Sequence, residues 1–269
     1  MSNPDVPDPA RFGSVFGANP SFADLLRVTR PEAVPPILRQ PVTAADLPMP
    51  HGTTVLGLKY TDGMMMAGDR RATSGNLIAD AKMRKVFAAD DNSAIAIAGA
   101  AGQAVEIVKL FQLELEHYEK ITGDRLSLEG KANRLAQMIR GNLPAAMQGL
   151  VVVPLFGGYD QRRGEGRIFY YDATGGRWEE DDFQTTGSGG MPAKNSLKKR
   201  WRSGLSRDEA IGVAVEALVD AAEDDSATGG PDAARGIFPN VVAVTSSGAE
   251  DVPEDEVAAA VSAVMGGRA

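Results

Sequence analysis

The sequence predicts an α+β fold in which two mainly antiparallel sheets pack face to face and helices cover each outer face. Strand-like segments come in consecutive pairs joined by short turns, which is the pattern of β-hairpins. Helix-like segments also come in pairs, and their broad apolar stripes are suited to covering a sheet. A regular alternation of single strands with single helices, typical of a parallel sheet, is not seen. These observations together favour four layers in the order αββα.

Two hairpins are predicted before any helix. Residues 53–60 (TTVLGLKY) and 63–69 (GMMMAGD) are rich in apolar residues, and an Asp-Gly turn separates them. Residues 84–90 (RKVFAAD) and 93–99 (SAIAIAG) form a second pair of the same kind. We therefore expect four strands at the start of the folded region.

A pair of helices is predicted next. Apolar residues at alternating spacings of four and three over residues 104–118 predict a helix, and Gly123 is expected to end it. A second helix is predicted from about residue 128 to residue 150. Pro144 lies within it and is expected to kink it, because proline lacks the backbone donor that a helix interior needs.

The remainder of the chain continues the pattern of paired strands and paired helices. The expected elements are, in order, strands over 150–160 and 166–172, helices over 190–201 and 207–223, a strand over 239–248 and a helix over 252–265.

The composition excludes several classes of site. The chain of 269 residues has no cysteine, and its two histidines are His51 and His117. Disulfides, cysteine nucleophiles, thiolate zinc sites and multi-histidine metal sites are therefore excluded. The net charge of −8 gives no support for nucleic-acid binding. No run reaches the ~18 apolar residues of a membrane span, and the first residues (MSNPDVPDPA) do not resemble a secretory signal, so a cytoplasmic location is expected.

The first fifty residues differ from the rest of the chain. Ten of the sixteen prolines lie there, and proline is incompatible with regular helix. The segment also holds a few apolar residues, so it is not purely solvating. Composition alone favours a disordered tail or docking arm, and a pro-segment that is removed on maturation is the alternative.

The junction His51-Gly52-Thr53 offers a way to make a nucleophile without histidine. If the Gly52–Thr53 bond were cut, Thr53 would carry both a hydroxyl and a free α-amine. An α-amine has an ordinary pKa of ~7.7–8.0, so at neutral pH a useful fraction can accept a proton. Thr53 would then supply nucleophile and base from one residue. Taken alone, the junction favours an ordinary entry to a strand over a nucleophile.

The motifs that follow Thr53 together resemble one known family. They are the runs TTVLGLKY, MAGDRRATSGN, RKVF, IAIAGAAG, GSGG and DDSATGG, in that order. This series looks like a β-type subunit of the 20S proteasome in its actinobacterial form, over about residues 53–255. The resemblance implies the four-layer αββα sandwich of the N-terminal-nucleophile (Ntn) hydrolases, in agreement with the element order.

The resemblance also implies a catalytic set. Thr53 matches the N-terminal nucleophile, and Asp69 and Lys85 match the acid and the lysine beside it. A buried lysine needs a paired charge, which Asp69 can supply, and a Lys85 cation near Thr53 would lower the pKa of its amine and hydroxyl. Gly99 matches the glycine whose N–H faces the developing oxyanion.

A second group of matched residues surrounds the terminal amine. Ser188 matches the serine near that amine, and Asp225 and Thr228 match the aspartate and hydroxyl that orient it. Asp224 is an adjacent rival, but the spacing to Thr228 favours Asp225. The family usually has serine at the position of Thr228, and threonine keeps the hydroxyl and its hydrogen bond.

Further matched positions are expected to bind the substrate. Thr73, Gly99 and Ala101 match positions that pair with the substrate main chain as an added β-strand. Positions expected around the side chain that precedes the cut share an apolar character: Ala72, Met83, Ile97, Ala101 and Val105. A preference for cleavage after apolar residues follows as a hypothesis.

The resemblance thus predicts a threonine endopeptidase that degrades unfolded or tagged proteins. Residues 1–52 are expected to be a propeptide removed by autocleavage between Gly52 and Thr53, and residues 53–269 a catalytic domain. No metal or organic cofactor is expected. The expected partners are other β copies in two stacked rings, capping rings of α subunits, a ring ATPase activator and polypeptide substrates, with no nucleic acid and no membrane.

Two alternatives accompany this interpretation. The simpler bacterial peptidase of the HslUV type is a shorter relative, but its motif at the Asp69 position typically reads GDGQ, and this chain has GDRR. A non-catalytic ring subunit is the other alternative. The presence of every matched group argues against it: Thr53, Asp69, Lys85, Ser188 and Asp225.

Overall fold

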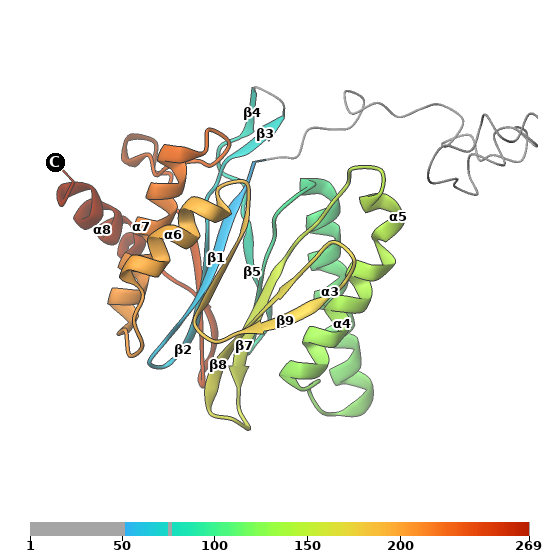
Figure 1. Ribbon diagram of the computed structural model, residues 1–269. Helices are drawn as coiled ribbons and strands as arrows, with labels where there is room; N and C mark the ends of the chain where they lie inside the picture. The colour runs from blue at the N-terminus through green and yellow to red at the C-terminus, as the bar shows by residue number, and fades with distance from the viewer. Residues whose placement is uncertain (1–51, 75–76, 269) are drawn as a thin grey trace, which may run out of the picture. The chain divides into compact units, whose positions relative to one another are not determined.

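Two five-stranded antiparallel sheets form the centre of the part of the chain that the computed structural model describes, residues 52–74 and 77–268 (Figure 1). The first sheet has the order β10 (Phe183–Gly187), β1 (Thr54–Tyr60), β2 (Gly63–Gly68), β11 (Asn240–Thr245), β12 (Gly248–Asp251). The second has the order β5 (Val86–Asp90), β6 (Ser93–Ala96), β7 (Leu155–Asp160), β8 (Glu165–Tyr171), β9 (Arg177–Glu180). A small hairpin pairs β3 (Ala72–Ser74) with β4 (Leu77–Asp80).

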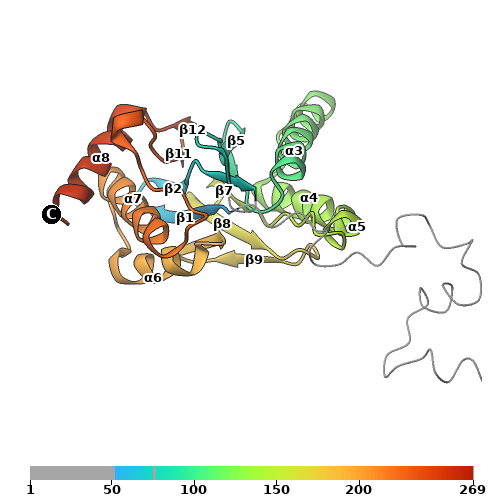
Figure 2. The same ribbon diagram turned by 90° about the horizontal axis from the view of Figure 1, so that it is seen from above.

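Helices cover the outer face of each sheet, as Figure 2 shows from above. The first sheet is covered by α6 (Gly190–Arg200), α7 (Arg207–Asp224) and α8 (Glu254–Gly266). The second is covered by α3 (Ala101–Thr122), α4 (Leu128–Gly141) and the short α5 (Leu143–Ala146). A 3₁₀ turn, Ala233–Arg235, precedes β11. This arrangement confirms the α+β fold and its four αββα layers.

The methionine run on β2 shows how the strand pattern builds three apolar layers. Met64 and Met66 point between the two sheets, whereas Met65 points toward the helices of the first sheet. All three are fully buried, because both faces of this sheet are covered. The same alternation on the second sheet places Ile95 under α3 and α4.

The helix pair on the second sheet ends differently from the prediction. α3 ends as expected at Gly123, which adopts a left-handed conformation with φ of 77° and bonds to the carbonyl of Glu119. The single kinked helix expected over 128–150 is wrong, because α4 stops at Gly141 and Asn142 caps it. Pro144 lies in the first turn of α5, where its missing N–H is not needed.

Several strands were not predicted. β3, β4, β9, β10 and β12 carry mostly exposed or polar residues, so they lack the apolar alternation of a half-buried strand. Six strands therefore precede α3 among the described residues, instead of four. The strand expected from residue 150 begins at Leu155, and before it only Val152 makes an isolated bridge, to Gly99.

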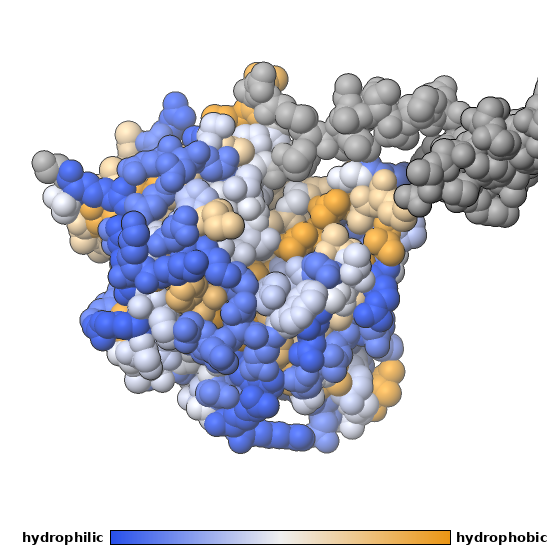
Figure 3. Space-filling view, viewed as in Figure 1, coloured by the Kyte–Doolittle hydropathy of each residue, from blue (hydrophilic) through white to orange (hydrophobic). Residues whose placement is uncertain are grey.

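The surface of the molecule is mainly hydrophilic in the view of Figure 3, with small apolar patches over the helix layer beside α5. Met147, which directly follows α5, is 81% exposed. Among the described residues, none of the helices combines the length and apolar character that crossing a membrane requires.

Candidate active site

The strand register brings three of the predicted residues to one end of the first sheet. Thr54 pairs with Gly187 and Val55 pairs with Gly68, so β1 begins where β2 and β10 end. Thr53, Asp69 and Ser188 are the residues just outside these strand ends. They therefore lie together at the end of the sandwich where β1 begins (Figure 1). Thr53 is only 5% exposed.

Asp69 and Lys85 form a buried ion pair at this end. The distance from Lys85 Nζ to Asp69 Oδ1 is 2.6 Å, and the two side chains are 1% and 0% exposed. The backbone N–H of Thr54 also donates to Asp69 Oδ1, at 2.8 Å. Asp69 Oδ2 accepts from the backbone N–H groups of Arg71 and Gly229, each at 2.9 Å. Four donors thus hold the carboxylate and compensate for its burial.

Lys85 makes two further contacts that direct its ammonium toward the Gly52–Thr53 bond. Nζ donates to the carbonyl of Arg71 at 2.5 Å and lies 3.5 Å from the carbonyl oxygen of Gly52. Burial lowers the pKa of Lys85 below its ordinary value, and the carboxylate of Asp69 opposes part of that shift. A cation with a lowered pKa beside a peptide carbonyl can stabilise negative charge or exchange a proton there.

Ser188, Asp225 and Thr228 form a second hydrogen-bonded group beside Thr53. The backbone nitrogen of Thr53 donates to Ser188 Oγ at 3.3 Å. The hydroxyls of Ser188 and Thr228 donate to Asp225 Oδ2 at 2.5 and 2.6 Å. Partial burial acts to raise the pKa of Asp225, but these hydrogen bonds outweigh it and hold that pKa below its ordinary value. The carboxylate is therefore ionised and orients both hydroxyls.

Thr54 belongs to the same group and was missed by sequence reasoning. Its hydroxyl lies 2.6 Å from the hydroxyl of Thr228, and both side chains are buried. The hydroxyl of Thr228 thus bonds to Asp225 and Thr54, and Asp225 and Ser188 connect it to the nitrogen of Thr53. The sequence feature that could have indicated this role is the second of the two consecutive threonines after Gly52.

Gly99 requires the absence of a side chain. Its φ of 111° lies in the region that favours glycine, and a Cβ there would lie 2.0 Å from the carbonyl oxygen of Val151. It lies in the short connection between β6, which ends at Ala96, and α3, which begins at Ala101. This backbone geometry explains the glycine, and its expected part as oxyanion donor stays a prediction.

The residues expected around the substrate lie in two places. Met83, Ile97 and Val105 belong to the apolar cluster between the second sheet and its helices. Ala72 is buried on β3, and Ala101 is the half-buried first residue of α3. Thr73, also on β3, accepts the backbone N–H of Gly52 at 2.9 Å through its hydroxyl. Thr73 therefore holds the residue that precedes the expected cut.

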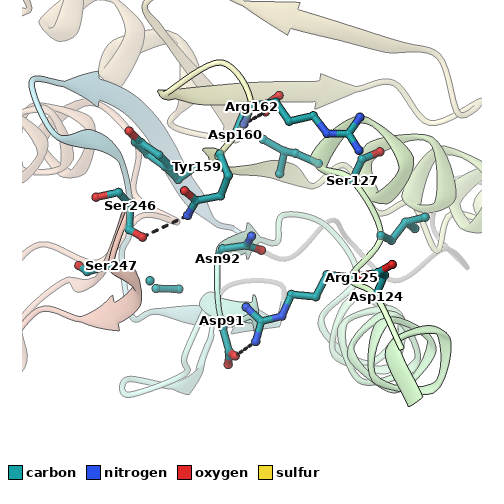
Figure 4. Close-up of a pocket in the computed structure, with 15 residues that line it drawn as sticks. Asp91, Asn92, Asp124, Arg125, Ser127, Tyr159, Asp160, Arg162, Ser246 and Ser247 are labelled. Atoms are coloured by element: carbon teal, nitrogen blue, oxygen red, sulfur yellow. Dashed lines mark hydrogen bonds and ion pairs between the residues drawn. The ribbon is translucent and has the colours of Figure 1, made fainter. Parts of the chain in front are cut away.

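A cavity of about 710 Å³ lies at the opposite end of the sandwich (Figure 4). Four turns line it, at residues 91–92, 124–128, 159–162 and 246–249. None of the predicted site residues is among them. Figure 4 shows Arg125 paired with Asp91. The side chain of Gln161 donates a hydrogen bond to the carbonyl of Ser246. Its polar lining pairs largely with itself. No group of three or more histidine, cysteine or acidic side chains in the described ranges is placed to hold a metal ion.

Comparisons with known proteins identify the family of this chain. The family described as "Proteasome subunit" matches residues 49–233 of this chain. A protein of Streptomyces griseus subsp. griseus, described as "Proteasome subunit beta", is 55% identical over 236 residues. That alignment covers 88% of this chain and 84% of the Streptomyces protein. The chain therefore belongs to the proteasome subunit family, as a β-type threonine endopeptidase subunit of the bacterial 20S core.

Proposed function

We propose that Thr53 is the nucleophile of this endopeptidase and that cleavage of the Gly52–Thr53 bond releases it. One observation carries the proposal: Thr53 is the point at which the two hydrogen-bonded groups meet. Its nitrogen bonds to Ser188, and the Lys85 ammonium beside it pairs with Asp69 and reaches the carbonyl of Gly52.

In the proposed reaction the free α-amine of Thr53 accepts the proton of its own hydroxyl. Lys85 keeps the pKa of both groups low, and Ser188 and Asp225 orient the amine. The Thr53 oxygen attacks the substrate carbonyl, and the N–H of Gly99 stabilises the oxyanion, a contribution of about 3–4 kcal/mol in comparable sites. The leaving amine takes the proton, and water then hydrolyses the ester on Thr53.

Self-cleavage acts on the chain's own peptide bond, at a stage when Thr53 has no free α-amine. The Thr53 oxygen attacks the Gly52 carbonyl, the hydroxyl proton passes to the peptide nitrogen, which leaves as the α-amine, and water then hydrolyses the ester between Gly52 and Thr53. The hydroxyl of Thr73 holds the N–H of Gly52 at 2.9 Å, and Lys85 Nζ lies 3.5 Å from its carbonyl oxygen. A Cβ on residue 52 would lie 1.9 Å from the Cβ of Ala227, so glycine fits this position and larger residues do not. We propose that residues 1–52 are a propeptide and that 53–269 form the mature domain. All of the propeptide except Gly52 lies outside the described residues.

Membership of the family implies assembly with other proteasome subunits. We further propose two stacked β rings capped by α rings, a ring ATPase as activator, and unfolded or tagged polypeptides as substrates, in the cytoplasm. A closed chamber of this kind keeps an unspecific protease away from folded proteins.

N-terminal sequencing and intact mass of the chain, co-expressed with its candidate α partner, test the proposal. We expect a new N-terminus at Thr53 in the wild type and in Thr53→Ser, which keeps a hydroxyl. Thr53→Ala is expected to keep residues 1–52 and to show no peptidase activity. An assembled wild-type chain that retains residues 1–52 would contradict the mechanism.

The apolar character of Ala72, Met83, Ile97, Ala101 and Val105 supports a preference for apolar residues before the cut. Matched fluorogenic peptides with apolar, acidic or basic residues at that position test it on the mature particle. Fastest cleavage after the acidic residue would refute the preference and leave the nucleophile assignment intact.

A further inference from the structure

Asn240, the first residue of β11, connects the two sheets at the active-site end. Its backbone is paired in register with Gly68, the residue before Asp69. Its side chain crosses to the second sheet. There Oδ1 accepts the N–H groups of Lys85 and Val86, at 3.1 and 2.8 Å, and Nδ2 donates to the carbonyl of Val86 at 3.1 Å.

The carboxamide of Asn240 acts on β5 as a neighbouring strand would. β5 is the edge strand of the second sheet within the described residues, so one side of its backbone is left without a strand partner. The carboxamide carries one acceptor and one donor group, and it satisfies both the N–H and the carbonyl of Val86. It therefore fixes the backbone at the residue that follows Lys85.

The two strands approach each other closely at this point. A Cβ on Gly68 would lie 3.3 Å from the Cβ of Lys85 and 3.2 Å from a methyl carbon of Val86. Asp69 comes from the first sheet and Lys85 from the second, yet Asn240 is bonded to the backbone beside both. The 2.6 Å ion pair between them thus has one common anchor.

We propose that Asn240 is a positioning residue for the peptidase reaction: it sets the Lys85 ammonium against Asp69 and the Thr53 nucleophile. The inference rests on the proposed role of Lys85. Asn240 touches the reacting atoms only through Lys85, so its effect is expected in the chemical step and in processing. Substrate binding, which uses β3 and the apolar cluster of the second sheet, is expected to be unaffected.

The test uses the full chain assembled with its α partner and compares three variants. Asn240→Ala removes the anchor. Asn240→Asp keeps the acceptor for the two N–H groups and loses the donor. Asn92→Ala is the matched control, since Asn92 Oδ1 bonds to Lys131, a buried lysine at the opposite end of the molecule. The readouts are the processing rate of folded chains, and kcat, KM and the pH profile per processed N-terminus.

For Asn240→Ala we expect kcat to fall about tenfold to a hundredfold, the size of effect that a small misplacement of a reacting group produces. KM is expected to stay within about twofold, since the apolar residues around the substrate are untouched. The ascending limb of the pH profile is expected to move to higher pH, because the Thr53 amine loses part of the influence of the Lys85 cation. The kcat of Asn240→Asp is expected to lie between those of Asn240→Ala and the wild type. The kcat of Asn92→Ala, per processed N-terminus, is expected to equal that of the wild type.

Two results would overturn the inference. One is an Asn240→Ala particle whose kcat and pH profile equal those of the wild type. The other is processing of folded Asn240→Ala and Asn240→Asp at the rate of Asn92→Ala. Lys85→Ala distinguishes a failure of the role proposed for Asn240 from a failure of the role proposed for Lys85. If Lys85→Ala is inactive while Asn240→Ala is normal, only the inference on Asn240 fails, whereas an active Lys85→Ala refutes the proposed mechanism itself.

Discussion

Two buried lysines lie at opposite ends of the sandwich, and each is paired with an aspartate. Lys85 is 2.6 Å from Asp69, and Lys131 is 2.5 Å from Asp90. Each lysine side chain is 1% exposed. Burying such a pair costs free energy in both places, because two charges lose most of their water. The difference between the pairs lies in what surrounds them.

The remaining contacts decide what each lysine does. Lys85 bonds to the carbonyl of Arg71 and reaches that of Gly52, next to the bond that we propose is cut. Lys131 bonds to the side chain of Asn92, and so ties α4 to the turn between β5 and β6. A buried ion pair is thus not in itself a sign of catalysis. It becomes one when it lies against a reactive bond.

The largest expected effect in this comparison comes from Lys85→Met, which keeps the side-chain volume and removes the charge. We expect a folded chain that keeps residues 1–52, with peptidase activity reduced at least about 10³-fold, because the cation beside the nucleophile is lost. Intact mass, circular dichroism and peptide hydrolysis measure the three properties. Normal processing of this variant would remove the distinction between the two lysines.

Lys131→Met is the matched change at the other end. It leaves Asp90 without its cation, which is expected to reduce the free energy of unfolding by about 3 kcal/mol. Processing and kcat of the assembled variant are expected to equal those of the wild type. Chemical denaturation and peptide hydrolysis test both parts, and a specific loss of kcat with unchanged stability would contradict the assignment.

Asp225→Asn tests the second group at the reactive end, with an expected loss of activity of about tenfold. The folded-state pKa of Asp225 is lowered, so its ionised form stabilises the fold above the ordinary value of ~3.9. That contribution is lost as the pH falls through the lower folded-state pKa. The stability difference between wild type and variant is therefore expected to be constant from about pH 7 to pH 5 and to shrink below about pH 4. Urea unfolding at several pH values measures it, and a difference that grows at acid pH would show that the sign is wrong.

Thr228→Ser is expected to have the smallest effect. Serine keeps the hydroxyl that bonds to Asp225 and Thr54, so activity should stay within about twofold of the wild type. Thr228→Val keeps the shape and removes the hydroxyl, and should cost about 1–2 kcal/mol of stability because buried partners lose a hydrogen bond. Denaturation and peptide hydrolysis of the two variants provide the check, with equal behaviour of both as the contrary result.

The sequence predicted the fold where strands are apolar on at least one face. β2 is buried throughout and β1 is buried except at Lys59, and both were predicted with nearly the observed bounds. β4 is exposed along its length and β9 is a polar edge strand, so neither has a pattern that separates it from a loop. The apolar spacing of the helix does not reveal the break at Asn142, after which Pro144 stands in the first turn of α5.

The site was predicted mainly through the resemblance to a family, and the structure adds the contacts. Thr53, Asp69, Lys85, Ser188 and Asp225 lie together at one end of the sandwich, and the variants above test the parts proposed for them in the reaction. Thr54 and Asn240 were not predicted. Asn240 stands in an ordinary strand entry, and its importance depends on a hydrogen bond between sheets that are joined only in the folded molecule.

The division of the site between two sheets also acts as a safeguard. Thr53 and Asp69 extend from the first sheet, and Lys85 precedes the edge strand of the second. In the proposed mechanism, a chain on which only one sheet has formed holds half of the reactive group and cannot cut the Gly52–Thr53 bond. In the proposed mechanism, release of the Thr53 amine therefore reports that both layers have docked, and an incompletely folded subunit is harmless to the proteins around it.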